Sequence, residues 1–246
     1  MIMATMDSGG RLELDASDFD AMYRQSDELG IGAVWDIGRV QPQVRRWHEE
    51  GLITGPVLDA GCGAGSISVW LARHGYQVTA VDYSTVALEK ARDRARAAGV
   101  KVTWARQDAT RLTLPDHEPF ATALDAALYH CLPQSASREQ YLDCLHRVTR
   151  PDARLLMMCF ADTAPPAMPG PSRISREELH TVLPRHGWTI ESLQPADYLT
   201  HWTPDLLKKS AAAADIDLDA STLPIGDDGY VPIPVWTVVA HRVTRR

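Results

Sequence analysis

Three glycines and an acidic residue stand close together in the run Val-Leu-Asp-Ala-Gly-Cys-Gly-Ala-Gly over 57–65. The apolar start of this run predicts a buried strand that ends at Gly61, and a helix is expected from about Ser66. Gly61 and Gly63 let the backbone bend sharply and lie against a ligand with no Cβ in the way. Asp59 would repel a pyrophosphate at this turn but could pair with the amino group of a methionine moiety.

Two more acidic residues follow the next two predicted strands. Asp82 lies about 20 residues past the glycine turn, where a carboxylate can accept hydrogen bonds from both ribose hydroxyls of an adenosine. Tyr83 beside it could lie against the adenine face. Asp108, with Ala109 next to it, follows the third strand and could accept a hydrogen bond from the adenine amino group. Acids placed after three successive strands predict a nucleoside pocket at one edge of a sheet.

Over roughly 57–160, these residues resemble the class I S-adenosylmethionine-dependent methyltransferases. The resemblance implies S-adenosylmethionine as cofactor, S-adenosylhomocysteine as product, and a sheet of seven strands whose last strand is antiparallel. It implies cofactor contacts from the five motif residues Asp59, Gly61, Gly63, Asp82 and Asp108. The fourth-strand segment Leu-Asp-Ala-Ala-Leu-Tyr-His over 124–130, which includes Asp125, would line the cofactor where methyl donor and acceptor meet.

His130 ends that segment and is the candidate catalytic and acceptor-binding residue. Ligands bind outside the carboxyl ends of such strands, so His130 could be a general base or an orienting group. The alternative, a histidine that only packs, stays open. The Asn/Asp-Pro-Pro-aromatic motif of enzymes that methylate nucleic-acid bases is missing from the segment, and no further carboxylates near Asp125 suggest a catechol-type metal site. We therefore expect no metal and a small aromatic or heterocyclic acceptor, methylated on oxygen or nitrogen.

The N-terminal region carries a second resemblance. Tyr23 and the run Trp-Asp-Ile-Gly-Arg-Val-Gln-Pro over 35–42 look like the entry segment of bacterial methyltransferases related to the thiopurine and mycobacterial heterocycle and quinone enzymes. The resemblance implies that Trp35 covers the methionine end of the cofactor and that Tyr23 approaches the acceptor. A Trp35 that merely anchors the leader is the alternative. Trp202 is a candidate wall of the acceptor pocket.

Short apolar runs alternate with amphipathic stretches from residue 57 onward, which predicts an α/β fold of the Rossmann-like, doubly wound kind. Strands are expected over 57–60, 77–81, 100–105, 120–128, 154–160, 188–193 and 235–243. Ser84, Ser137 and Ser175 are expected to cap helices, with Gly99 ending the first of these. Residues 1–50 form a leader and residues 51–246 the main domain, and we expect the leader and the Pro-, Asp- and Gly-rich insertion over 195–234 to form a lid.

Composition argues against some classes of binding partner. The 246 residues carry a formal net charge of −7 and no basic stripe, which argues against a nucleic-acid partner. The four cysteines include no C-x-x-C pair, and no apolar segment reaches membrane-spanning length, so a cytoplasmic protein with free thiols is expected. The oligomeric state is left open. A nicotinamide-dependent oxidoreductase and a cofactor-binding protein without catalysis are the competing functions.

Overall fold

The computed structural model describes residues 5–6, 12–13, 15–28, 30, 33–114, 118–164, 172–213, 215 and 217–244. Its main element is a seven-stranded sheet with the order β5-β4-β3-β6-β7-β9-β8. The strands are β3 (Val57–Ala60), β4 (Val78–Asp82), β5 (Thr103–Arg106), β6 (Phe120–Ala126), β7 (Thr149–Phe160), β8 (Trp188–Tyr198) and β9 (Ile233–Arg242). The first five are parallel, and β9 runs antiparallel to both β7 and β8. The predicted Rossmann-like α/β fold with an antiparallel last strand is confirmed.

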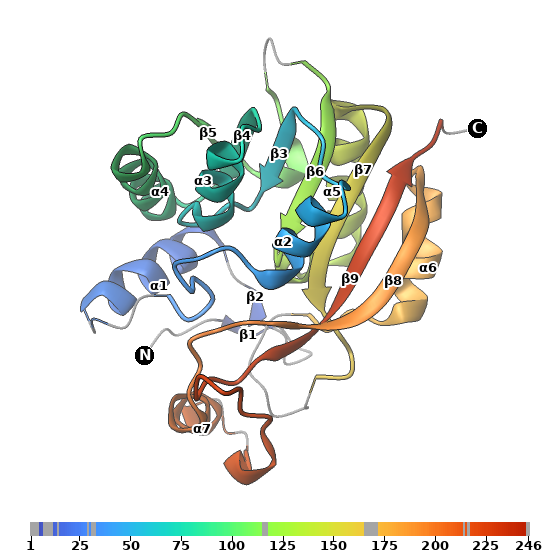
Figure 1. Ribbon diagram of the computed structural model, residues 1–246. Coiled ribbons are helices and arrows are strands. Elements are labelled where there is room, and N and C mark those ends of the chain that lie inside the picture. The colour runs from blue at the N-terminus through green and yellow to red at the C-terminus, as the bar shows by residue number, and fades with distance from the viewer. Residues whose placement is uncertain are drawn as a thin grey trace.

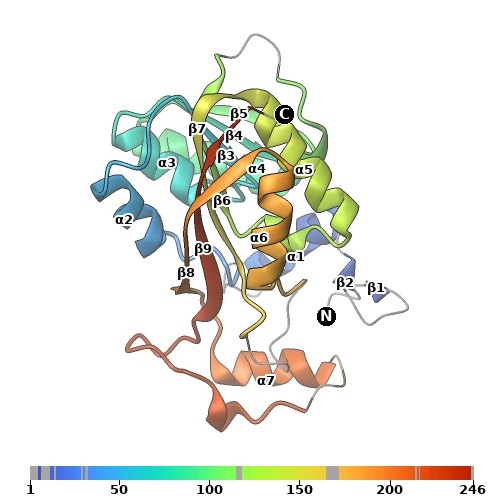
Figure 2. The same cartoon turned by 90° about the vertical axis from the view of Figure 1, so that its right-hand side faces the viewer.

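Helices cover both faces of this sheet. They are α1 (Ala16–Glu28), α2 (Pro42–Glu49), α3 (Ser66–Arg73), α4 (Thr85–Ala98), α5 (Ser135–Val148), α6 (Arg176–Arg185) and α7 (Pro204–Ala213), with short 3₁₀ turns η1 (Ala109–Arg111), η2 (Tyr129–Cys131) and η3 (Ala220–Thr222). Seen edge-on, α2 and α3 lie on one side of the sheet, and α5 and α6 lie on the other (Figure 2). A two-stranded ribbon of β1 (Thr5–Met6) and β2 (Leu12–Glu13) was not predicted.

The two faces of the sheet build two apolar cores. Successive strand side chains point to opposite faces, so Leu155 packs with residues of α5 and α6 while its neighbour Leu156 packs with residues of α2 and α3. Both side chains are fully buried. The continuous apolar runs of β6 and β7 follow from this, because a central parallel strand is covered on both faces.

Two of the three predicted serine caps are confirmed. Ser84 accepts a hydrogen bond from the N–H of Ala87, and Ser175 accepts one from the N–H of Glu178. The prediction at Ser137 was wrong, because α5 already begins at Ser135 and Ser137 lies within its first turn. A capping-box pattern cannot exclude an earlier start, since the residues before it are also compatible with a helix.

The leader and the insertion lie toward one end of the sheet. The arrowheads of β6 and β7 point toward the end of the molecule where α7 lies, and α1 lies along the neighbouring side below α3 and α4 (Figure 1). β8 continues to Tyr198, so the irregular part of the insertion begins later than residue 195 and includes α7. In open α/β sheets, ligands bind outside the carboxyl ends of the parallel strands. The leader and the insertion therefore lie near the edge of the sheet where a ligand is expected.

Candidate functional site

The glycine turn after β3 has the backbone conformation that its sequence predicts. Gly61 and Gly63 have φ angles of 68° and 52°, which side-chain-bearing residues rarely adopt. A Cβ built at Gly61 would lie 2.8 Å from the Cβ of Leu128, and one at Gly63 would lie 2.8 Å from the hydroxyl oxygen of Tyr23. Glycine is therefore required here both for the turn and for the close approach of two other segments.

Asp82, the last residue of β4, faces this turn. Its Oδ2 accepts a hydrogen bond from Gly63 N–H at 2.8 Å, and its Oδ1 accepts one from Ser84 N–H at 2.9 Å. Burial raises the pKa of Asp82, while those backbone N–H groups oppose the rise. Each oxygen keeps a second lone pair, so the half-buried carboxylate can still accept the two hydroxyls of a ribose.

Tyr83 and Asp108 flank Asp82 on the predicted adenine side. The Tyr83 ring is half-buried and lies 5.6 Å from the ring of Phe19 in α1. Asp108 is exposed and caps η1, where its Oδ1 accepts hydrogen bonds from both the N–H and the hydroxyl of Thr110. Oδ2 can still accept a hydrogen bond from an adenine amino group. Ala109, which follows, is buried.

The side chain of Asp59 is buried. Its side chain is 1% exposed, and its Oδ2 accepts a 2.5 Å hydrogen bond from the Ser68 hydroxyl of α3. Burial raises the pKa of Asp59 to about 6, and the nearby charge of Asp82 acts in the same direction. Oδ1 is not the acceptor of this hydrogen bond, and an ion pair of Asp59 with a methionine amino group stays a prediction.

The carboxylate of Asp125 stabilises the turn that follows β6. The residue is fully buried, and its oxygens accept hydrogen bonds from Leu128 N–H, Tyr129 N–H and the Tyr141 hydroxyl. These bonds hold the chain reversal after β6, in which Ala127 has a φ of 84°. The carboxylate thus stabilises this turn, and the contact of this segment with a cofactor stays a prediction. Burial raises its pKa to about 7.

His130 lies in η2 directly after that reversal. It is 2% exposed, and its ring stacks on the ring of Phe160, with centroids 3.8 Å apart. Nδ1 accepts a hydrogen bond from Phe160 N–H at 3.3 Å, which places the proton of the neutral imidazole on Nε2. Burial lowers the pKa of His130 to about 3. In this state Nε2–H is a hydrogen-bond donor, and the basic lone pair of Nδ1 is occupied by the Phe160 N–H.

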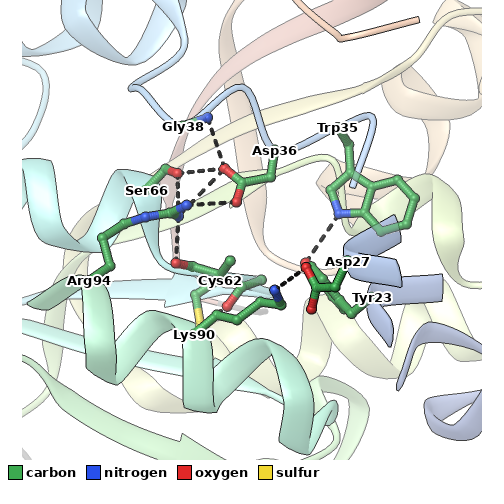
Figure 3. A network of polar contacts seen from close by, with 11 residues as sticks. Tyr23, Asp27, Trp35, Asp36, Gly38, Cys62, Ser66, Lys90 and Arg94 are labelled. Carbon is green, nitrogen blue, oxygen red and sulfur yellow. Dashed lines mark hydrogen bonds and ion pairs between the residues drawn. The ribbon is translucent and has the colours of Figure 1, made fainter. Parts of the chain in front are cut away.

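The leader brings Tyr23 and Trp35 together against the glycine turn. Trp35 Nε1–H donates to the Tyr23 hydroxyl at 3.1 Å, and the two rings meet edge to face at 5.7 Å (Figure 3). Tyr23 is 3% exposed, and its hydroxyl lies beside Gly63. The structure therefore places the Tyr23 hydroxyl against the glycine turn, and its approach to the acceptor stays a prediction.

Trp202 lies in the insertion and is half-buried against the core that α2 and α3 cover. The neighbouring His201 N–H donates to Val34 O at 2.7 Å. Gln41 adds two bonds, since its side-chain N–H donates to Leu199 O and its side-chain oxygen accepts from Leu199 N–H. Leader and insertion are thus joined. Sequence analysis missed Gln41, although it stands in the run over 35–42 that drew attention to the leader.

The acidic residues at this edge of the sheet suit a nucleoside that carries positive charge. Asp59, Asp82 and Asp125 lie within the last two residues of three neighbouring strands, and their pKa values are all raised mainly by burial. Negative charge held at low solvent exposure stabilises a cation and disfavours a pyrophosphate. S-adenosylmethionine carries a sulfonium and an ammonium group, so the residues present fit it. Among the described residues, no group of three or more potential ligands could hold a metal ion, and no helix is long and apolar enough to cross a membrane.

Known methyltransferases resemble the chain, both in one shared domain and over most of its length. A family profile for the methyltransferase domain matches residues 57–152. The 2-heptyl-1-hydroxyquinolin-4(1H)-one methyltransferase of Mycobacteroides abscessus is 28% identical over 228 residues, which are 91% of this chain and 96% of that protein. An uncharacterized methyltransferase of Schizosaccharomyces pombe is 31% identical over 122 residues, which are 49% of this chain and 78% of that protein.

A solved structure agrees over a similar length. It comes from work on the conversion of a disulfide bond into a thioacetal group during echinomycin biosynthesis, and it shares 28% identity and a TM-score of 0.73 with this chain. The similarity covers 93% of each chain. The similarities to this structure and to the Mycobacteroides abscessus protein extend well beyond residues 57–152.

Proposed function

Because the chain belongs to the S-adenosylmethionine-dependent methyltransferases, we propose that it methylates an oxygen or nitrogen atom of a small aromatic or heterocyclic acceptor. One observation supports the proposed class of acceptor. The similarity to the hydroxyquinolone methyltransferase spans 96% of that protein, so it extends to elements on both sides of the shared methyltransferase domain. The aligned 91% of this chain takes in parts of both the leader and the insertion, which in this proposal line the path of the acceptor.

Bound S-adenosylmethionine supplies an activated methyl group on a sulfonium, which reacts by direct displacement. The protein must hold the acceptor in line with that methyl group and keep water out, and orientation alone can lower a barrier by several kcal/mol. Asp82 would hold the ribose, Asp108 and Tyr83 the adenine, and Trp35 with Tyr23 would cover the glycine turn. Asp59 would pair with the amino group of the methionine moiety, and the segment that holds Asp125 would line the cofactor.

His130 would orient the acceptor. Its Nδ1 is occupied by Phe160 N–H, so Nε2–H is the remaining polar group of the ring. A donor there suits an acceptor that presents a carbonyl or phenolate oxygen. Removal of a proton from the acceptor would then fall to solvent or to the acceptor's own acidity, because the pKa of His130 lies near 3.

The joined leader and insertion would form the lid. Val34, Gln41 and Leu199 link the two segments by backbone and side-chain hydrogen bonds, and Arg39 adds an exposed ion pair with Asp228 at 3.9 Å. Closing such a cover excludes water and fixes the reactants. Trp202 would form part of the acceptor wall, since it follows His201 directly on the insertion side of this link.

An acceptor panel tests the proposal. The purified protein is incubated with S-adenosylmethionine and matched sets of N-hydroxyquinolones, phenols, heteroaromatic amines, aliphatic thiols and carboxylic acids, and products are detected by mass spectrometry. Methylated products confined to the aromatic hydroxyl and nitrogen compounds would support the proposal. Turnover confined to thiols or carboxylates would refute the acceptor class. Cofactor binding without any turnover would favour a non-catalytic role.

A further inference from the structure

Polar residues of α4 and its N-cap hold the leader in three places. Lys90 and Arg94 lie one helical turn apart on α4, and Ser84 caps its beginning. Ser84, Lys90 and Arg94 donate hydrogen bonds to Asp20, Asp27 and Asp36 of the leader respectively. Since α4 starts three residues after Asp82, the helix that follows the predicted ribose-binding acid also supports the leader.

The contact at Asp36 differs from the other two because it also reaches the glycine turn. Arg94 Nη2–H donates to Asp36 Oδ2 at 2.9 Å, and Arg94 Nη1–H donates to Ala64 O and to the Ser66 hydroxyl oxygen, both at 2.6 Å. The Ser66 hydroxyl in turn donates to Asp36 Oδ1 at 2.7 Å, and Gly38 N–H donates to the same oxygen. Figure 3 shows Arg94 and Ser66 converging on this one carboxylate.

This network is one residue away from the aromatic cover of the turn. Asp36 follows Trp35, whose indole N–H donates to the Tyr23 hydroxyl. That hydroxyl lies beside Gly63, while Arg94 holds the carbonyl of the adjacent Ala64. The position of the two rings over the turn is therefore tied to the turn itself.

We propose that Asp36 and Arg94 are positioning residues of the cofactor site, acting through Trp35 and Tyr23. The pair clasps the leader to the glycine turn and so controls how tightly and how long the cofactor is covered. This inference rests on the proposed role of the leader as a cover, and it does not depend on the identity of the acceptor.

The charge state of the pair supports this role. Burial alone would raise the pKa of Asp36, but the hydrogen bonds from Arg94 and Ser66 hold it below its usual value. The side chains of Arg94 and Asp36 are 31% and 17% exposed, so the pair is partly shielded from solvent and salt. On the same helix, Arg96 pairs with Asp93, and both side chains are largely exposed, which provides a matched control.

The test measures S-adenosylhomocysteine binding by calorimetry and its dissociation by stopped flow for Asp36→Asn, Arg94→Gln, the double variant, Arg94→Lys and Arg96→Gln. We expect each of the first two substitutions to raise the dissociation constant about tenfold and to speed dissociation, with the double variant no worse than the more affected single variant. Arg94→Lys should restore part of the affinity, and Arg96→Gln should bind as the unaltered protein does.

Tryptic cleavage after Arg24 and Arg39 supplies a second readout. Both residues are exposed and lie in the leader, so S-adenosylhomocysteine should protect them in the unaltered protein and protect them less in Arg94→Gln. A lower melting temperature with unchanged affinity, dissociation rate and protection would overturn the proposal and leave the pair a stabilising contact only. Equal effects of Arg94→Gln and Arg96→Gln would overturn it as well. Neither outcome touches the proposed acceptor class, which the acceptor panel tests separately.

Discussion

His130 shows how a single residue's surroundings change the chemistry that its type suggests. A histidine at the carboxyl end of a central strand could serve as a general base, with a pKa near 6.5 in water. In the structure its ring is enclosed, stacked on Phe160, and holds a backbone N–H at Nδ1. Burial lowers its pKa to about 3, so the imidazole is neutral at every pH at which the enzyme would be assayed.

A pH profile and two substitutions test the orienting role of His130. Because the ring is already neutral, kcat/KM with a non-ionising acceptor should show no inflection from His130 between about pH 5 and about pH 8. His130→Phe keeps the stacked ring but removes the donor, and it should lower kcat/KM by about tenfold. His130→Asn keeps a donor and should retain more activity. An inflection near pH 6.5 that disappears in His130→Asn would identify a base instead.

At the scale of elements, Gln41 is the link with the clearest energetic consequence. Its side chain is 2% exposed and bonds both backbone groups of Leu199, so it joins the start of α2 to the segment after β8. Gln41→Met should lower the free energy of unfolding by about 1–3 kcal/mol, because two partly buried backbone groups lose their partner. Denaturant unfolding measures this effect. Unchanged stability would show that water replaces the amide without cost.

Sequence patterns predicted the local elements, such as β3 and the glycine turn, better than the contacts between distant segments. β3 and the glycine turn follow from an apolar run and obligatory glycines, which are local features. The burial of Asp125 could not be predicted, because it depends on Tyr141, a residue 16 positions away on α5. The clasp between Asp36 and Arg94 joins residues 58 positions apart, and charged residues at such separations give no periodic signal. The early start of α5 was missed for a local reason, since its N-cap is Gln134, whose side chain makes no capping hydrogen bond.

Across the whole molecule, buried acids make the site sensitive to pH. Asp59 and Asp125 have pKa values of about 6 and about 7 because burial favours their neutral forms. A bound cation favours their ionised forms, so binding of a cation should release protons and weaken as the pH falls. S-adenosylmethionine carries the sulfonium charge that S-adenosylhomocysteine lacks, and only the former has this extra attraction.

The ratio of the two dissociation constants isolates that effect. Between about pH 8 and about pH 5, we expect the affinity for S-adenosylmethionine to fall roughly three- to tenfold relative to that for S-adenosylhomocysteine, since the acids lose their charge. Calorimetry at several pH values measures both ligands under the same conditions. Asp59→Asn should flatten the dependence. A ratio that stays constant with pH would mean that the acids do not sense the sulfonium.

Methyl transfer from isotopically labelled S-adenosylmethionine in a single turnover tests the central claim most directly. The protein is mixed with the cofactor carrying a deuterated methyl group and with a 2-alkyl-1-hydroxyquinolin-4-one, and both products are measured by mass spectrometry. We predict that the intact labelled methyl group appears on an oxygen or nitrogen of the acceptor, with one S-adenosylhomocysteine formed per methyl transferred. Asp82→Asn should slow the reaction at limiting cofactor, because it weakens the ribose contact. Cofactor bound at the glycine turn with no label in this acceptor or in any aromatic member of the panel would contradict the account.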